Sequence, residues 1–326
     1  MIKIAIVGMG LIGTSIGMAL RNAEERDSPL GKIQVVGYDE HRRATAEARN
    51  KLGIDKEMPT LAEAVREAQL IIIAVPVRAA QEILRSLVTL ATPGAVITDV
   101  SSTKADVLAW AQELLPASLH FVGGHPMAGR ELSGPSGAES TLFKDAIYCL
   151  CPMVTTHPDA VALVEAMVKQ IGAKPYFIDP HEHDAYVGGV SHLPFLLSST
   201  LVKTVTQRPA WREMAPLAAA GFRDMTRLAA GSPVMHRDIL ATNRASMVHW
   251  INEMAQVLLD VRDMLEDSQD DELLAMFADA QQKREEWLES KPNMRPGEAD
   301  FENMSGVTPE RPNMFGFKTR KRPPQT

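Results

Sequence analysis

The sequence predicts a doubly wound α/β domain with a parallel sheet, followed by an all-helical domain. Two observations carry this prediction: short apolar segments alternate with helical patterns through the first 180 residues, and the strand signal stops after His181. Strands that are buried on both faces read as unbroken apolar runs, because helices cover a parallel sheet from both sides. The length of 326 residues fits two domains of about 150 residues each.

The first domain is expected to cover residues 1–180. Its predicted strands are Lys3–Val7, Ile33–Tyr38, Leu70–Val75, Ala95–Thr98, His120–Val122, Ala146–Cys151 and Lys174–Ile178. Segments with the apolar spacing of helices separate them: Leu11–Ala23, Arg42–Lys51, Leu61–Ala68, Ala79–Leu90, Lys104–Leu115 and Asp159–Ile171. This alternation is typical of strands that lie between two helical layers.

The second domain, residues 181–290, carries helical patterns only: His192–Thr206, Met214–Ala219, Asp238–Glu266 and Glu272–Ser290. In the longest of them, apolar residues recur at alternating spacings of four and three and form one stripe: Met247, Ile251, Met254, Leu258, Val261 and Leu265. Such a stripe packs either within its own domain or in a dimer core, and we favour a homodimer. Residues 291–326 hold six prolines and end in basic residues, so we expect an irregular tail there.

Composition excludes several classes of protein. Hydrophobic residues make up 45% and charged residues 23%, the balance of a folded globule. The net charge of −7 argues against a nucleic-acid binder. The longest strongly apolar run, Leu70–Val77, is far shorter than the roughly 20 residues of a membrane helix, and no targeting segment is visible. We therefore expect a cytoplasmic protein without nucleic-acid or membrane partners.

The cysteines and histidines indicate neither a redox pair nor a metal site. Cys149 and Cys151 are two positions apart, so on a strand they point the same way, as two small buried hydrophobes do. His181, His183 and Asp184 lie close in sequence, but no second ligand set with metal-site spacing accompanies them. We predict no bound metal.

A glycine motif directly follows the first strand and opens the first helix. The segment Gly8-Met9-Gly10-Leu11-Ile12-Gly13 has the spacing that makes a tight turn, lets the backbone approach a pyrophosphate and packs helix against strand. The helix N-terminus then offers N–H groups to the phosphates. The sequence therefore predicts a Rossmann-type dinucleotide site.

Two more segments are expected at this site. Asp39 ends the second strand, where a carboxylate accepts hydrogen bonds from ribose hydroxyls and repels a 2′-phosphate, so NAD is favoured. Arg42 and Arg43 follow closely and leave NADP possible. Val75-Pro76 ends another strand at the crevice edge, although a proline that merely ends a strand explains this pair as well.

Candidate catalytic residues follow two further strand ends. Asp99–Lys104 joins a strand to a helix, and although Ser and Thr there are typical helix caps, Ser102 and Lys104 face the ligand crevice of such a sheet. His125 lies in the glycine-rich segment Gly123–Glu131, which we interpret as a loop with room for a ligand. A loop histidine suits proton transfer, and Glu131 is placed to orient or close the same pocket.

The helical domain adds arginines beside glycine in Gly221–Arg227. Such arginines bind carboxylates well, although on these residues alone surface ion pairing is the better explanation.

Taken together, these segments resemble the prephenate/arogenate dehydrogenase family of tyrosine biosynthesis. The matching segments, in family order, are Gly8–Ser15, Asp99–Lys104, Gly124–Glu131, His183-Asp184, Ser191–Pro194 and Gly221–Arg227. The family combines a Rossmann domain with a helical dimerisation domain. The resemblance implies NAD(P)-dependent oxidative decarboxylation of prephenate to 4-hydroxyphenylpyruvate, or of arogenate to tyrosine, with release of CO2.

The resemblance also implies roles for individual residues. His125 deprotonates the ring hydroxyl, Ser102 supports that hydroxyl or His125, and Arg227 holds the ring carboxylate. The remaining substrate-side or gating positions are Asp184, Ser191, Asp224 and Glu131.

The chain departs from the family pattern at Phe195, where many members have a second histidine that contacts substrate. The choice between prephenate, arogenate or both is therefore open. No mutase or regulatory ACT segment is expected in this chain. Two alternatives are a β-hydroxyacid dehydrogenase, whose lysine motif has no clear match here, and a non-catalytic NAD-sensing dimer, against which the set of His125, Ser102 and Arg227 argues.

Overall fold

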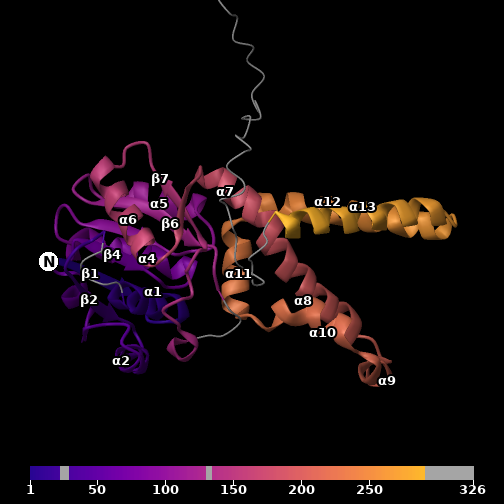
Figure 1. Ribbon diagram of the computed structural model, residues 1–326, viewed down its shortest axis with the longest axis horizontal. Coiled ribbons are helices and arrows are strands. Elements are labelled where there is room, and N and C mark those ends of the chain that lie inside the picture. The colour runs from indigo at the N-terminus through magenta and orange to yellow at the C-terminus, as the bar shows by residue number, and fades with distance from the viewer. Residues whose placement is uncertain (23–28, 130–133, 291–326) are drawn as a thin grey trace, which may run out of the picture.

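The computed structural model describes residues 1–22, 29–129 and 134–290, which form a sheet domain with two helical arms on one side (Figure 1). The sheet has eight strands in the order β3-β2-β1-β4-β5-β6-β7-β8. Their bounds are β1 Ile2–Val7, β2 Ile33–Tyr38, β3 Lys56–Glu57, β4 Leu70–Ile73, β5 Val96–Asp99, β6 His120–Pro126, β7 Ile147–Pro152 and β8 Lys174–Phe177. The strand order reverses between β1 and β4, and ligands bind at the carboxyl ends of strands at such a point.

Helices cover both faces of the sheet. Alternate residues of β1 enter different cores: Ile4 and Ile6 pack on one face, and Ala5 and Val7 on the other. The first core includes residues of α1 (Leu11–Asn22), α2 (Arg42–Asn50) and α6 (Pro158–Gln170). The second includes residues of α3 (Leu61–Val65), α4 (Val77–Leu90) and α5 (Ala105–Leu114). The predicted doubly wound α/β architecture is confirmed.

The expectation of an entirely parallel sheet is wrong at one edge. β7 runs antiparallel to β6, and β8 runs parallel to β7. A parallel neighbour requires a crossover, usually a helix, whereas an antiparallel one does not. The described residues between β6 and β7 contain only a short 3-10 turn, Pro135–Gly137, so the chain returns in the opposite direction.

The first part of the glycine-rich segment Gly123–Glu131, up to Pro126, is strand rather than loop. Gly123, Gly124 and His125 pair with β7, and β6 ends at Pro126. A Cβ on Gly123 would lie 2.5 Å from the Leu108 side chain, and one on Gly124 would lie 2.5 Å from the Asp99 carbonyl oxygen. These glycines therefore permit close packing and do not mark a loop. Cys149 and Cys151, on β7, are buried and unpaired as predicted.

The second domain begins with α7 (Pro180–Val187), which continues through the π-helix Gly188–His192 into α8 (Leu193–Thr206). It continues with α9 (Trp211–Met214), α10 (Ala220–Thr226), the 3-10 helix η4 (Arg227–Ala230), α11 (Pro233–Thr242), α12 (Arg244–Glu266) and α13 (Asp270–Glu289). The single helix predicted over Asp238–Glu266 is wrong, because the chain breaks at Asn243 between α11 and α12. The predicted tail, residues 291–326, lies outside the described residues.

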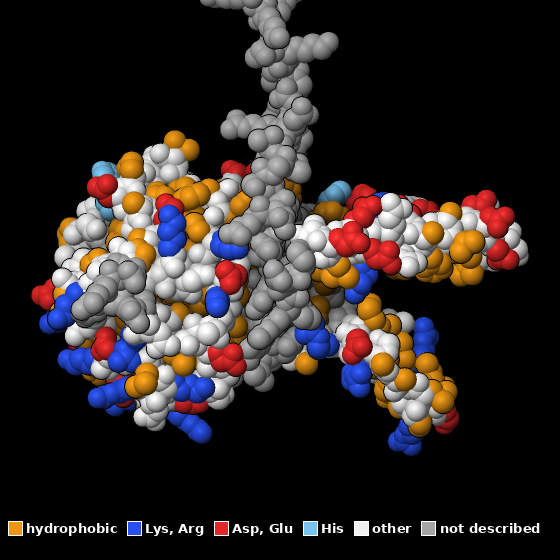
Figure 2. Space-filling model, in the orientation of Figure 1, with side chains coloured by type: hydrophobic (Ala, Val, Ile, Leu, Met, Phe, Trp, Pro, Cys, Tyr) orange, Lys and Arg blue, Asp and Glu red, His pale blue; other side chains and the backbone are white. Residues whose placement is uncertain are grey.

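The two arms expose apolar side chains along their length. Helices α12 and α13 form one arm, and α8, α9 and α10 form the other (Figure 1). Along the predicted stripe of α12, Met247 is buried, but Ile251 is 41%, Leu258 59% and Leu265 63% exposed. Hydrophobic side chains are visible on both arms in Figure 2. The outer part of the stripe therefore does not pack within its own domain.

One helical run reaches the length and apolarity of a membrane helix. Within the described residues it is the run Pro180–Thr206, in which a window of 18 residues has a mean hydropathy of 1.2 and is 33% buried within the protein. The core helix of a soluble protein meets the same criterion, so this finding is weak evidence for a membrane segment.

Candidate active site

The glycine turn follows β1 and lies against the residues that follow β4. Gly8 has a φ of +99°, and a Cβ there would lie 2.4 Å from the Ala74 carbonyl oxygen. A Cβ on Gly13 would lie 2.0 Å from the Gly8 carbonyl oxygen, whereas one on Gly10 would meet nothing within 4 Å. The turn is thus closed by its own backbone on one side and open at Gly10, as the approach of a pyrophosphate requires.

Asp39 is fixed beside this turn. One carboxylate oxygen accepts the Met9 N–H at 2.8 Å, and the other accepts the His41 N–H at 2.8 Å. Each carboxylate oxygen has a second lone pair, so the group can still accept hydrogen bonds from a ribose. Of the other predicted cofactor contacts, Leu11 is buried and Ile12 partly exposed at the start of α1, and Val75-Pro76 leads into α4. These residues fit a dinucleotide.

Gly10→Ala and Gly13→Ala are expected to separate binding from folding. Gly13→Ala forces its methyl group into the Gly8 carbonyl, so the free energy of unfolding should fall by about 1–3 kcal/mol. Gly10→Ala should unfold like the unmodified protein but bind NAD at least about tenfold more weakly, because its methyl group projects toward the dinucleotide. Thermal unfolding and a fluorescence titration with NAD measure the two effects. Unchanged NAD affinity in Gly10→Ala would contradict the site.

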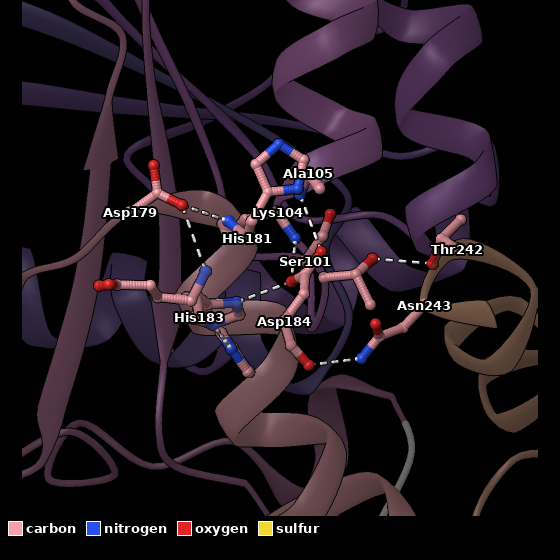
Figure 3. A network of polar contacts seen from close by, with 12 residues as sticks. Ser101, Lys104, Ala105, Asp179, His181, His183, Asp184, Thr242 and Asn243 are labelled. Atoms are coloured by element: carbon pink, nitrogen blue, oxygen red, sulfur yellow. Dashed lines mark hydrogen bonds and ion pairs between the residues drawn. The ribbon is translucent and has the colours of Figure 1, made fainter. Parts of the chain in front are cut away.

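Figure 3 shows buried hydrogen bonds around His183 and Asp184. They continue to His125, at the carboxyl end of β6. His125 Nδ1 lies 2.9 Å from His183 Nε2, and His183 Nδ1 lies 2.8 Å from Asp184 Oδ1. All three side chains are buried, with His125 the most exposed at 8%.

The contacts of Asp184 determine the tautomers along this chain. Its carboxylate accepts the backbone N–H groups of Lys104 at 2.7 Å and Ala105 at 2.9 Å, which places a negative charge at the N-terminus of α5. Because an ionised carboxylate only accepts hydrogen bonds, His183 Nδ1–H donates to it. His183 Nε2 then carries a lone pair and accepts from His125 Nδ1–H. The lone pair of His125 is consequently on Nε2, the ring nitrogen that takes no part in this series of hydrogen bonds.

The surroundings of His125 keep its ring neutral. Burial, and then the neighbouring His183, Lys104 and His192, hold the pKa of His125 well below its usual value of 6.5. A neutral imidazole with a lone pair at Nε2 is a proton acceptor at physiological pH.

Lys104 and Asp184 bind other residues of the chain in this structure, and their predicted roles toward the substrate stay predictions. The Lys104 ammonium pairs with the Asp99 carboxylate, donates to the Gly124 carbonyl oxygen at 2.6 Å and is fully buried. Asp99 also accepts the N–H groups of Ser101 at 2.9 Å and Gly124 at 3.0 Å. Lys104 and Asp184 therefore hold the strand ends and α5 in place beneath His125.

The other predicted residues lie around this network or outside it. Ser102 is partly buried between Ser101 and Thr103, and Ser191 is partly exposed on the π-helix. Arg227 and Asp224 are exposed, and Asp224 lies 3.4 Å from Arg223. Glu131 lies outside the described residues.

Sequence reasoning missed the roles of Asp99, His183 and Asn243. Asp99 and His183 both lie in segments that carried the resemblance. The partner of Asp99 is Lys104, 5 residues along the sequence, and the partner of His183 is His125, 58 residues away. Asn243 stood inside a predicted continuous helix. In the structure its side-chain amide donates to the Asp184 carbonyl oxygen at 2.7 Å.

Comparison with known proteins gives consistent matches over both domains. Residues 26–177 match the family model for the prephenate dehydrogenase nucleotide-binding domain, and residues 179–279 match that for the prephenate dehydrogenase dimerization domain. The chain is 35% identical over 288 residues to the prephenate dehydrogenase of Bacillus subtilis, covering 86% of this chain and 75% of that protein. It is 30% identical over 283 residues to the cyclohexadienyl dehydrogenase of Zymomonas mobilis, covering 86% and 94%.

Two solved structures resemble the fold. The crystal structure of prephenate dehydrogenase from A. aeolicus in complex with hydroxyphenyl propionate and NAD+ superimposes with a TM-score of 0.80 at 27% identity, covering 88% of this chain and 98% of that one. The Synechocystis arogenate dehydrogenase superimposes with a TM-score of 0.72 at 27% identity, covering 88% and 100%.

Proposed function

Because this chain belongs to the prephenate dehydrogenase family, we propose that it catalyses the NAD-dependent oxidative decarboxylation of prephenate to 4-hydroxyphenylpyruvate, with arogenate as the alternative substrate. The observation that carries the proposal is the hydrogen-bonded chain from Asp184 through His183 to His125. It presents a neutral proton acceptor at the same edge of the sheet as the glycine turn.

In this mechanism, His125 Nε2 accepts the proton of the ring hydroxyl while the carbon that bears it loses hydride. NAD, when bound, supplies the hydride acceptor. The C–C bond to the ring carboxylate then breaks, CO2 leaves, and its bonding electrons complete the aromatic ring. His125 returns the proton to the phenolic oxygen, so the reaction yields one product phenol, one CO2 and one reduced cofactor without net proton release.

His183 and Asp184 act as positioning residues for His125. Burial and the neighbouring His183 disfavour a proton on His125, so the ring holds the proton only until it returns to the phenolic oxygen. Asp184 supplies a fixed negative charge, and His183 lies between it and His125. The hydrogen-bonded chain therefore fixes the orientation of the His125 ring and keeps its lone pair on Nε2.

We propose that Arg227 holds the ring carboxylate and that Ser102 and Ser191 border the substrate. Arg227 begins η4, and this 3-10 helix is fixed to α8 because the Ala229 N–H donates to the Ser198 hydroxyl at 3.0 Å. A guanidinium suits a planar carboxylate because it donates two parallel hydrogen bonds. Asp224 lies on α10, the helix before η4, and is assigned a gating role only.

Phe195 bears on the choice of substrate. Its ring stacks on that of His236, with centroids 4.2 Å apart and planes 4° from parallel. An imidazole thus remains beside the position where many family members have histidine. Burial lowers the pKa of His236, so the ring is a neutral hydrogen-bond donor at physiological pH. A neutral donor serves the side-chain carboxylate that prephenate and arogenate share, which supports activity on both.

The test is an assay of the purified protein with prephenate and with arogenate, each with NAD and with NADP. We expect reduced nicotinamide absorbance and CO2 release with prephenate and NAD. Turnover with neither substrate would contradict the proposed function. The ratio of kcat/KM between the substrates, and between the cofactors, gives the preference, because differential transition-state binding sets that ratio.

We propose a homodimer built by the two arms. The exposed apolar residues of the α12–α13 arm, such as Leu258 and Phe277, support a partner surface there. Light scattering should give twice the 35.7 kDa of one chain. Leu258→Glu should weaken the dimer, whereas Val154→Glu, a fully exposed site on the sheet domain, should not. A monomeric mass at micromolar concentration would contradict the proposal.

We further propose a cytoplasmic enzyme that does not span a membrane. The apolar run Pro180–Thr206 supports this location, because His183, Asp184 and His192 are buried within it and bind residues of the sheet domain and of the α11–α12 corner.

A further inference from the structure

Asn243 occupies the corner between α11 and α12, where its side chain caps neither helix. It is 5% exposed, and its amide nitrogen lies 2.7 Å from the Asp184 carbonyl oxygen and 3.2 Å from His192 Nδ1. A backbone carbonyl only accepts hydrogen bonds, so the atom facing it is the NH2 group of the amide. The second hydrogen of this NH2 is then available to His192 Nδ1.

The direction of that hydrogen bond determines the state of His192. Burial is the main influence on this ring and lowers its pKa to about 4, so the ring is neutral at pH 7. A neutral ring whose Nδ1 accepts from Asn243 must carry its hydrogen on Nε2. His192 is 1% exposed, and within the described ranges its Nε2 has no hydrogen-bond partner.

A buried donor without a partner destabilises a protein by about 1–3 kcal/mol, so its retention calls for an explanation. The Ser102 backbone forms a weak hydrogen bond with the ring that favours its protonated form, so Nε2 lies beside the segment that leads from β5 to α5 without a partner at full hydrogen-bond distance in the described part of the chain. The Nε2–H group is therefore a donor held next to a proposed substrate residue.

We propose that Asn243 is a positioning residue that locks His192 in the Nε2–H tautomer, so that the ring offers a hydrogen-bond donor to an oxygen of the substrate beside Ser102. The substrate part of this inference rests on the proposed function, but the tautomer does not. If Asn243 had only a structural role at the helix corner, substitutions at position 243 would not change the tautomer of His192.

The experiment measures the tautomer directly, in the full-length protein labelled with ¹⁵N-histidine and without substrate. Ring signals of His192 are identified by their loss in His192→Gln. At pH 7 the unmodified protein should show the proton on Nε2. Asn243→Asp replaces the donor by an acceptor, so the proton should move to Nδ1 or the ring should become doubly protonated.

Asn243→Ala provides a second variant for the case in which Asn243→Asp does not fold, since a carboxylate that faces the Asp184 carbonyl oxygen is repelled. Loss of the amide should let His192 populate both tautomers and should raise KM about tenfold, the effect of losing an oriented hydrogen bond. Thr242→Val is the matched control. The Thr242 hydroxyl lies 2.8 Å from that of Thr103 at the same corner, so its loss should lower stability without changing the tautomer.

Two results would overturn the proposal. One is a proton on Nδ1 of His192 in the unmodified protein. The other is a His192 tautomer that stays as in the unmodified protein in both Asn243→Asp and Asn243→Ala. Failure of the proposed function has a different signature. It would appear as absent turnover with either substrate, whatever the tautomer of His192.

Discussion

Replacing His125 by asparagine is expected to lower kcat by about 100- to 10,000-fold, the range that a positioned general base contributes. Asparagine can still form hydrogen bonds near His183, but it cannot take a proton from the ring hydroxyl. Because the lost interaction belongs to the transition state, KM should change little. Steady-state kinetics with prephenate and NAD measure both constants.

The matched control for this variant lies on the same strand. His120 begins β6 and His125 lies near its end, so His120→Asn makes the same chemical change at the opposite edge of the sheet. We expect near-normal kcat for His120→Asn. Normal turnover in His125→Asn would remove this residue from the proton-transfer role.

The pH dependence of kcat/KM gives an independent check on His125. Proton transfer needs the neutral ring, and burial together with His183, Lys104 and His192 opposes its protonation. The rate should therefore hold as the pH falls through 6.5, and the acid limb should lie well below that value. In His125→Asn this limb should be absent from the residual activity.

Local patterns predicted most of the sheet domain. β2, Ile33–Tyr38, was predicted with the bounds that the structure has, because an apolar run flanked by polar residues gives a clear strand signal. The glycine turn was equally readable, because the spacing of its three glycines lies within six consecutive residues, even though the atom that excludes a Cβ at Gly8 belongs to the distant Ala74.

Predictions that depended on distant neighbours were less successful. Gly123 and Gly124 were interpreted as a loop because nothing in the sequence shows that Leu108 and the Asp99 backbone leave no room for a Cβ. The break at Asn243 was invisible for a similar reason, since its amide binds groups 59 and 51 residues away. Tertiary contacts of this kind override local propensity.

Lys104 illustrates a buried partnership that sequence reasoning did not predict. A lysine at a strand end that faces the crevice was expected to touch substrate. The structure turns its side chain inward to Asp99, with both side chains at 0% exposure. An ammonium in the interior requires a buried partner of opposite charge. That partner is Asp99, the first residue of the segment Asp99–Lys104, and nothing in the sequence marks the two as a pair.

Lys104→Met should consequently produce the largest loss of stability among simple substitutions at the site. It leaves the Asp99 carboxylate buried with only the N–H groups of Ser101 and Gly124, and it leaves the Gly124 carbonyl oxygen without its lysine donor. Removing one partner of a buried ion pair destabilises a protein by about 3–5 kcal/mol. The expected drop in Tm is about 6–20 °C, measured by thermal and urea unfolding.

A double-mutant cycle distinguishes an unpaired charge from lost packing. Asp99→Asn/Lys104→Met removes both charges and should be more stable than Lys104→Met alone, because no ion then remains in the interior. The surface control is Lys283→Met, which removes an exposed i,i+4 pair with Asp279 and should change stability by less than about 0.5 kcal/mol. If Lys104→Met is no less stable than this control, the buried pair does not anchor the strand ends that carry His125, and the positioning of the base must come from the Asp184 chain alone.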